Sequence, residues 1–278
     1  MLIFSLRTRL RRSIEMIDPS IIKEKMKSKE YSNSSLNYDK LFPIGHHDIP
    51  AKGKKERNTK KLSDFLPCFI DKFNKYDEKA LKSLWKRREK IIKSFKKTFD
   101  QELQTKKYLM VGSGCPSIFD NGFTLMRNYG VPYIPASAFK GAFSHYVAQE
   151  LEQDNPIKKN YKFLFGTGDN DDNIRGALIF LDVLPRSYSL GIDIINNHFQ
   201  PYYSDEKNEK APNDYYDPVP VQYLVIDSGS VFRFTVLDNG NIGDDLKQEL
   251  EKSLMDFLGD FGLGAKTSYG YGLFKKPK

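Results

Sequence analysis

The sequence predicts an α+β fold with the element order βαββαβ, preceded by a basic, partly helical extension and interrupted by an inserted loop or hairpin. Three observations support this prediction. Strand-like and helix-like hydrophobic patterns follow each other in this order over residues 106–278. The first hundred residues hold 26 Lys and Arg against 13 Asp and Glu, a positive excess that the rest of the chain lacks. A polar stretch over about 187–217 separates two strand patterns.

The extension is expected over residues 1–105, packed on or inserted in the same domain. Residues 1–60 are polar and poorly periodic, which is typical of loops. Residues 77–104 predict one long amphipathic helix, because apolar side chains recur at helical spacing, namely Leu81, Leu84, Trp85, Ile91, Ile92, Phe95, Phe99 and Leu103. Lysines and arginines cover the other side of this helix. That side is either a solvated basic face or a contact surface for the backbone of RNA or DNA, and both interpretations stay open.

The domain itself is expected over residues 106–278 and begins with a strand and a helix. KKYLMVGSG (106–114) predicts a buried strand that ends in a glycine turn. Two prolines in VPYIPASAFKGAFSHYVAQEL (131–151) predict an extended entry to a helix, for which Ser137 is the expected N-cap. The apolar face of this helix comprises Phe139, Phe143, Tyr146, Val147 and Leu151.

The middle of the domain is predicted to supply strands. YKFLFG (161–166) predicts a short strand or a helix end, and RGALIFLDVLPR (175–186) predicts an apolar strand that Pro185 ends. PVQYLVIDSGSVFRFTVLD (220–238) predicts a hairpin with its turn at residues 227–230. The second arm of this hairpin alternates, with one face formed by Phe232, Phe234 and Val236 and the other by Arg233 and Thr235.

A second helix and a closing strand complete the domain. GDDLKQELEKSLMDFLGD (243–260) predicts a helix, which Asp244 or Asp245 favours at its start and Gly259 at its end. Its apolar face comprises Leu246, Leu250, Leu254, Phe257 and Leu258. Residues 268–274 alternate as a strand does. The resulting order is the ferredoxin-like (RRM-like) arrangement, which RNA-recognition domains use with one sheet face open to the ligand.

The stretch FGLGAKTSYGYGLF (261–274) is rich in glycine. It is not a Walker loop, because Ala265 precedes Lys266 and because the stretch follows a helix and opens a strand. Glycines let the backbone approach a neighbour closely, and their amides can point at an anion. Lys266, Thr267 and Ser268 add a charge and hydrogen-bond donors. The stretch is therefore either a phosphodiester-binding loop or a tight connection without a ligand.

Other residue patterns exclude several classes of function. Cys68 and Cys115 lack the paired spacing of a zinc site or a disulfide scaffold, so a reducing, cytoplasmic compartment is expected. No run of about 18 apolar residues is present, so no membrane partner is expected. The acidic run at 169–173 lacks the bidentate Glu of a calcium loop and predicts a polar loop. No metal site, cofactor or catalytic residue is expected.

Several of these segments resemble one family. PYIPASAFKGAF (132–143) resembles the PyIPGSSlKGalR signature of the RAMP superfamily of CRISPR-associated RNA-binding proteins, and FGLGAKTSYGYGLF resembles its C-terminal glycine-rich loop. Residues 163–186 and 193–234 are similar to the family of sixth Cmr subunits of type III-B CRISPR effector complexes. Ser137 and Lys140 match the signature, whereas the departures from it are Ala136, Ala138, Ser144 and His145.

This resemblance implies a non-catalytic RNA-binding structural subunit. Such a subunit holds the 3′ region of the guide RNA (crRNA) and caps the filament of backbone subunits. Its expected partners are the guide RNA, target RNA through the guide, and other Cmr subunits. The expected RNA-binding residues are Ser137, Lys140, Gly262, Gly264, Lys266, Thr267, Ser268 and Tyr269.

The main alternative is a metal-independent endoribonuclease that processes guide-RNA precursors, because such enzymes of the same superfamily use His or Lys for proton transfer. The candidates are His46, His47, His145 and His198. Adjacent histidines rarely face one site, and His145 falls at the boundary of a helix's apolar face, which predicts a structural histidine. His198 is interpreted as structural or as an RNA or partner contact. A third hypothesis is a protein-bridging subunit whose glycine-rich loop is a plain turn.

Overall fold

The structure is a computed structural model and describes residues 78–115, 117, 121–168, 174–203, 205 and 210–277, with Ser35, Tyr38, Leu66, Pro67, Phe69, Ile70 and Phe73. The chain divides into two compact units, residues 1–77 with 125–131 and residues 78–124 with 132–278. In the first unit, the ring centroids of Phe69 and Phe73 lie 4.7 Å apart. The second unit holds an α+β fold, as the sequence predicts. The proposed division at residue 105 stays a prediction.

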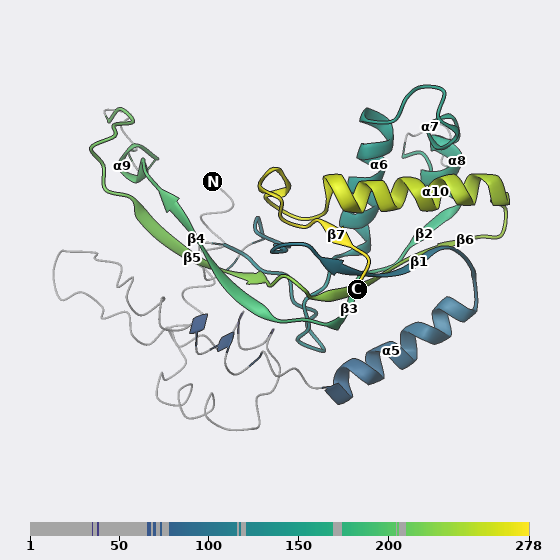
Figure 1. Cartoon of the computed structure of the whole chain (residues 1–278), viewed down its shortest axis with the longest axis horizontal. Helices are drawn as coiled ribbons and strands as arrows, with labels where there is room; N and C mark the ends of the chain where they lie inside the picture. The colour runs from purple at the N-terminus through teal and green to yellow at the C-terminus, as the bar shows by residue number, and fades with distance from the viewer. Residues whose placement is uncertain are drawn as a thin grey trace. The chain divides into compact units, whose positions relative to one another are not determined.

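An antiparallel sheet forms the centre of the second unit (Figure 1). Among the described residues its strands are β1 (Lys96–Thr105), β2 (Leu178–Phe180), β3 (Leu184–Ser187), β6 (Val231–Asp238) and β7 (Phe274–Lys275). The strand order is β2-β6-β1-β7, and β3 also pairs with β6. Because β1 and β2 or β3 flank it, β6 is buried along most of its length.

Two helices cover one face of this sheet. They are α6 (Ala136–Gln149), between β1 and β2 in the chain, and α10 (Asp244–Asp256), between β6 and β7 (Figure 1). The predicted apolar faces meet there, since Phe139 of α6 packs edge-on against Phe234 of β6 with 5.5 Å between ring centroids. Both rings are fully buried, and burying each contributes about 1.5–3 kcal/mol. Smaller helices beside α6 are α7 (Pro156–Lys159) and α8 (Tyr161–Phe165), so residues 161–165 are helical.

The helix predicted over 77–104 was wrong in its second half. Helix α5 (Glu78–Lys93) ends before Lys96, and the rest of that segment is β1. Phe99 and Leu103 are four residues apart, a spacing that fits one face of a helix and one face of a strand equally well. Pairing with β6 decides the outcome, because Phe99 lies opposite Val236 and Leu103 opposite Phe232 on the buried face.

The hairpin predicted over 220–238 was also wrong. Strand β5 (Val219–Ile226) pairs with β4 (Leu190–Asn197) in a separate two-stranded sheet, whereas β6 joins the main sheet. The turn between β5 and β6 does form, with Gly229 at φ +84°. Part of the polar stretch at 187–217 thus supplies β4, which leads into the short helix α9 (Gln200–Tyr203).

Four smaller predictions need correction. Residues 106–114 form no regular strand; within them, only Leu109 makes an isolated β-bridge, to Ile226. Segment 175–186 is divided between β2 and β3. Ser137 does not cap α6, because the helix already begins at Ala136. The Asp182 carboxylate instead accepts a hydrogen bond from the Ala136 amide at 2.8 Å. Gly259 does not end α10, since a π-helical turn, η1 (Phe257–Phe261), continues it.

No helix in the described part of the chain is long and apolar enough to cross a membrane. Apart from Ser35 and Tyr38, residues 1–60 lie outside the described residues, as do His46 and His47 among them and the acidic run at 169–173, so the predictions for these segments stay predictions.

Candidate nucleic-acid interface

The glycine-rich stretch folds back on the segment that follows β1. The amide of Ala265 donates to the Met110 carbonyl at 2.8 Å, and the amide of Gly272 donates to the Tyr108 carbonyl at 2.8 Å. Within the stretch, the Leu263 amide donates to the Gly272 carbonyl at 2.9 Å. Residues 262–272, here called the C-terminal loop, are therefore held by backbone hydrogen bonds rather than by a regular strand.

The glycines of the C-terminal loop have a structural reason. Gly264 has φ +95°, and a Cβ there would lie 2.4 Å from the Met110 carbonyl oxygen. A Cβ on Gly272 would lie 1.8 Å from the Leu263 carbonyl oxygen. At both positions, the space that a side chain would need is occupied by the chain's own backbone, so glycine is required there whether or not a ligand binds. RNA contact by Gly262 and Gly264 stays a prediction.

Lys266 lies at the centre of a side-chain network. Its backbone has φ +61°, which is rare for a residue other than glycine. Its ammonium donates a hydrogen bond to the Tyr223 hydroxyl at 2.6 Å and lies 4.3 Å from the centroid of that ring. Burial lowers the pKa of Lys266, and the nearby Asp193 carboxylate opposes that shift.

The network joins the C-terminal loop to the sheet of β4 and β5. The Tyr223 hydroxyl of β5 donates to the Asp193 carboxylate of β4 at 2.6 Å, and the Tyr271 hydroxyl of the loop donates to the same oxygen. Burial and the hydrogen bond to Asp193 raise the pKa of Tyr223 well above its usual range. Sequence reasoning missed Asp193, Tyr223 and Tyr271, because no motif links three positions on separate segments.

The outer rim of the C-terminal loop is open to solvent. Thr267–Tyr269 form one 3-10 turn, η2, in which Ser268 is exposed and the Tyr269 side chain is 78% exposed. Lys107 lies alongside, since a Cβ on Gly270 would be 3.5 Å from its Nζ. The rim thus offers an aromatic ring and an ammonium group to a ligand.

Ser137 and Lys140 lie on a different element, the first two turns of α6. Ser137 is exposed, and the Lys140 ammonium donates to the Phe165 carbonyl at 2.8 Å. Both residues line a surface hollow with Arg175, which precedes β2. The predicted site residues therefore fall into two groups, one on α6 and one in the C-terminal loop. Arg175 was missed, although its exposed guanidinium is a natural partner for phosphate.

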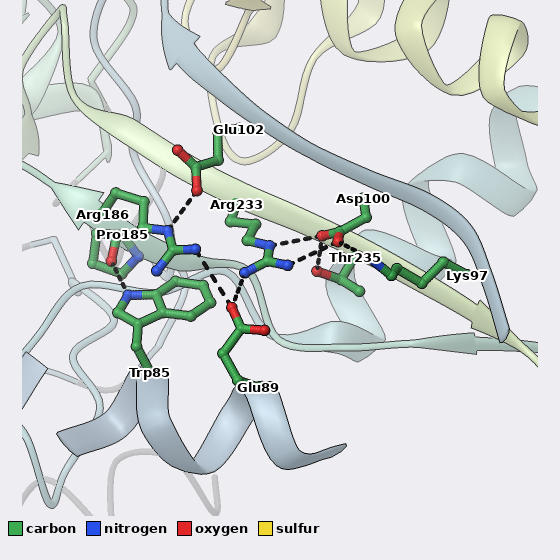
Figure 2. A network of polar contacts seen from close by, with 9 residues as sticks. All are labelled: Trp85, Glu89, Lys97, Asp100, Glu102, Pro185, Arg186, Arg233 and Thr235. Atoms are coloured by element: carbon green, nitrogen blue, oxygen red, sulfur yellow. Dashed lines mark hydrogen bonds and ion pairs between the residues drawn. The ribbon is translucent and has the colours of Figure 1, made fainter. Parts of the chain in front are cut away.

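The face of the sheet opposite α6 and α10 is covered by α5 (Figure 2). Arg233 of β6 makes a bidentate contact with Asp100 of β1, at 2.7 and 2.8 Å, and also contacts Glu89 of α5. The guanidinium carbon of Arg186 of β3 lies 3.7 Å from the centroid of the Trp85 ring of α5. The expectation of a sheet face open to RNA therefore fails over the area that α5 occupies.

Charge pairing on this covered face shifts the pKa of its acids and bases. Burial alone would raise the pKa of Asp100, but hydrogen bonds from Arg233 and Lys97 lower it below its usual value. Hydrogen bonding to Asp100 raises the pKa of Arg233 further above its already high value. Both groups are therefore fully charged at neutral pH, as a structural ion pair requires.

The histidines give no catalytic cluster in the described residues. His145 is exposed on α6, and the structural role predicted for it stays a prediction. His198 is exposed beyond the end of β4. Among the residues the structure describes, no group of three or more His, Cys, Asp and Glu side chains could hold a metal ion.

Comparisons with known proteins support the predicted resemblance. The family model of the RAMP superfamily matches residues 102–275. CRISPR system Cmr subunit Cmr6 of Pyrococcus furiosus is 31% identical over 226 residues, covering 62% of this chain and 66% of that protein. The protein of the same name from Saccharolobus solfataricus is 28% identical over 264 residues, covering 90% of this chain and 85% of that protein. The chain thus spans just under two thirds of the first relative.

The fold is also found in a solved structure. A chain in the cryo-EM structure of the type III-B Cmr-beta complex bound to cognate target RNA superposes with a TM-score of 0.60. It is 24% identical, and the match covers 83% of this chain and 78% of that one. This match shows a shared fold, whereas the family model and the two named relatives confirm the resemblance that the motifs indicated.

Proposed function

The chain belongs to the RAMP superfamily, and on that premise we propose that it is a non-catalytic, RNA-binding structural subunit of a type III-B CRISPR (Cmr) complex. Its proposed role is to hold the 3′ region of the guide RNA and to cap the filament of backbone subunits. Two relatives named Cmr6 support the assignment to this position. The proposed partners are the guide RNA, target RNA through the guide, and other Cmr subunits.

The observation that carries the RNA-binding role is the rim of the C-terminal loop. This rim combines exposed Ser268 and Tyr269 with the neighbouring Lys107. Ammonium groups attract phosphates without reading sequence, and an exposed tyrosine ring stacks on any base. A subunit that accepts guides of many sequences needs this kind of contact.

The group on α6 supplies a second phosphate contact in this proposal. Lys140 and Arg175 bring two positive charges to the hollow that Ser137 also lines. Arg175 is suited to bidentate contact with a phosphate, and the Ser137 hydroxyl is suited to a single hydrogen bond. In this account Lys266 contributes positive charge at the loop and fixes its shape.

We also propose that the core of the second unit is ferredoxin-like. The strand order β2-β6-β1-β7 supports this, because the first and third strands of a βαββαβ unit occupy the centre. The placement of α6 after β1 and α10 after β6, on one face of the sheet, also supports it (Figure 1). Helix α5 and the sheet of β4 and β5 are then additions to that core.

One binding experiment tests the proposed function. The purified chain is incubated with end-labelled single-stranded RNA in EDTA over a series of salt concentrations, and both retardation and cleavage are scored. We expect salt-sensitive retardation of intact RNA. A discrete cut that survives EDTA and disappears in His145→Ala or His198→Ala would overturn the proposal in favour of a processing endoribonuclease.

In the reconstituted complex, Lys140→Ala with Lys266→Ala is expected to weaken retention of guide RNA.

A further inference from the structure

The outward side of α5 carries a line of exposed lysines. Lys86, Lys90 and Lys93, here called the lysine stripe, are separated by four and three residues and are all exposed. Such spacings place side chains on one face of a helix, one above the other. Between Leu81 and Lys93 the only acidic residue is Glu89, which points to the sheet and contacts Arg233 (Figure 2). The stripe is therefore a line of positive charge without an acid among it.

The inward side of α5 is fixed to the sheet. The Trp85 indole N–H donates to the Pro185 carbonyl at 2.9 Å, and the Arg88 guanidinium donates to the Asp182 carbonyl at 2.6 Å. Arg186 stacks on the Trp85 ring from the β3 side (Figure 2). These contacts hold the helix against rotation, so the lysine stripe is presented in one direction.

We infer that the lysine stripe is a second RNA-contacting surface, which binds the phosphate backbone on the side of the sheet opposite α6 and α10. This inference rests on the proposed function. With a rise of about 1.5 Å per residue, the three lysines extend over roughly 10 Å. Three ammonium groups spread over that length can contact separate phosphates of one strand. The surface is electrostatic and independent of RNA sequence.

Two structural roles for the same lysines are less consistent with the observations. Lys90 and Lys93 lie in the last turn, where positive charge stabilises a helix terminus. Lys86 lies about two turns from that end, so the helix dipole does not account for it. A protein partner is also disfavoured, because protein interfaces are depleted in Lys. The exposed apolar residue of this helix, Ile91, lies on its other flank.

The test uses the full chain and a fluorescent single-stranded RNA whose binding is followed by anisotropy as salt is increased. The triple variant Lys86→Gln, Lys90→Gln and Lys93→Gln removes the stripe, and the corresponding triple Lys→Arg variant keeps its charge. A matched control removes three exposed lysines elsewhere, by Lys159→Gln, Lys162→Gln and Lys252→Gln. Circular dichroism checks that every variant keeps its helix content.

We expect the stripe variant to lower the slope of log affinity against log salt by about 2, since each phosphate contact with a single strand contributes ~0.7. The Lys→Arg variant and the matched control should keep the wild-type slope. A stripe variant with the wild-type slope would overturn the inference while leaving the proposed function intact. If the stripe variant keeps the wild-type slope but no longer enters the Cmr complex, the stripe binds a protein partner and the inference is overturned. Absence of RNA binding by the wild-type chain would overturn both.

Discussion

The Lys266 ammonium donates a hydrogen bond to the Tyr223 hydroxyl at 2.6 Å, so a lysine of the C-terminal loop is tied to a strand outside the main sheet. Tyr223 in turn donates to Asp193, and Tyr271 shares that acceptor. The position of the C-terminal loop is therefore linked to the position of the β4–β5 sheet. A ligand that moves one of them must rearrange the hydrogen bonds that hold the other.

Lys266 has two features that can be tested separately, namely its positive charge and its hydrogen bond to Tyr223. Tyr223→Phe removes the hydroxyl and is expected to lower the free energy of unfolding by about 1 kcal/mol, because one buried hydrogen-bonded group is lost. RNA affinity should change by less than about threefold, since the ammonium remains. Lys266→Ala should instead weaken RNA binding several-fold at low salt. Urea denaturation and RNA titration measure the two effects. Equal loss of RNA affinity in both variants would contradict this separation.

Gly264 provides a direct test of why the C-terminal loop contains glycine. Gly264→Ala places a Cβ 2.4 Å from the Met110 carbonyl oxygen at φ +95°, and the backbone must move to accept it. We expect the free energy of unfolding to fall by about 2 kcal/mol or more. Gly141→Ala is the matched control, because its Cβ enters open space on α6 and is expected to raise stability by about 0.5–1 kcal/mol. A Gly264→Ala variant as stable as wild type would show that the loop tolerates a side chain.

Periodic burial was predictable from the sequence where a long pattern fitted only one structure. The apolar faces of α6 and β6 pack together as their spacing predicts, with Phe139 against Phe234. The pattern failed where two structures share a spacing, as for Phe99 and Leu103. It also failed for the arms at 220–238, because adjacency in the chain suggested a hairpin while β4 offered β5 another partner.

The candidate interface was predictable only in part. Motif similarity indicated the C-terminal loop and the start of α6, and the structure describes both. It did not indicate that Asp193 contacts Tyr271, because 78 residues separate the two. Nor could charge alone show that Arg186 and Arg233 face inward, because their partners Trp85 and Asp100 come from other segments. Long-range contacts of this kind leave no local signal in a single sequence.

The chain's single tryptophan reports on the docking of α5. Arg186→Gln removes the guanidinium above Trp85 and the ion pair with Glu102. We expect a loss of about 1–2 kcal/mol in the free energy of unfolding. The Trp85 emission should shift to longer wavelength, since water gains access to the ring. Lys86→Gln, on the outward side of the same helix, should leave the emission unchanged. An unshifted spectrum in Arg186→Gln would mean that α5 docks without this contact.

The ion pair of Asp100 and Arg233 predicts how stability depends on pH. The folded-state pKa of Asp100 lies below its unfolded value of 3.8, so the pair contributes fully above that value and is lost as pH falls below it. Asp100→Asn should therefore lower the free energy of unfolding by about 1.5–3 kcal/mol at pH 7. The difference from wild type should shrink as the pH falls through and below the unfolded value, because the protonated wild-type carboxyl also loses the pair. Urea denaturation at several pH values between 7 and 2.5 measures this convergence.

Glu102→Gln is the control, because its half-exposed pair with Arg186 is worth less than about 1 kcal/mol. A constant difference between wild type and Asp100→Asn across this range would show that packing, not charge, accounts for the effect.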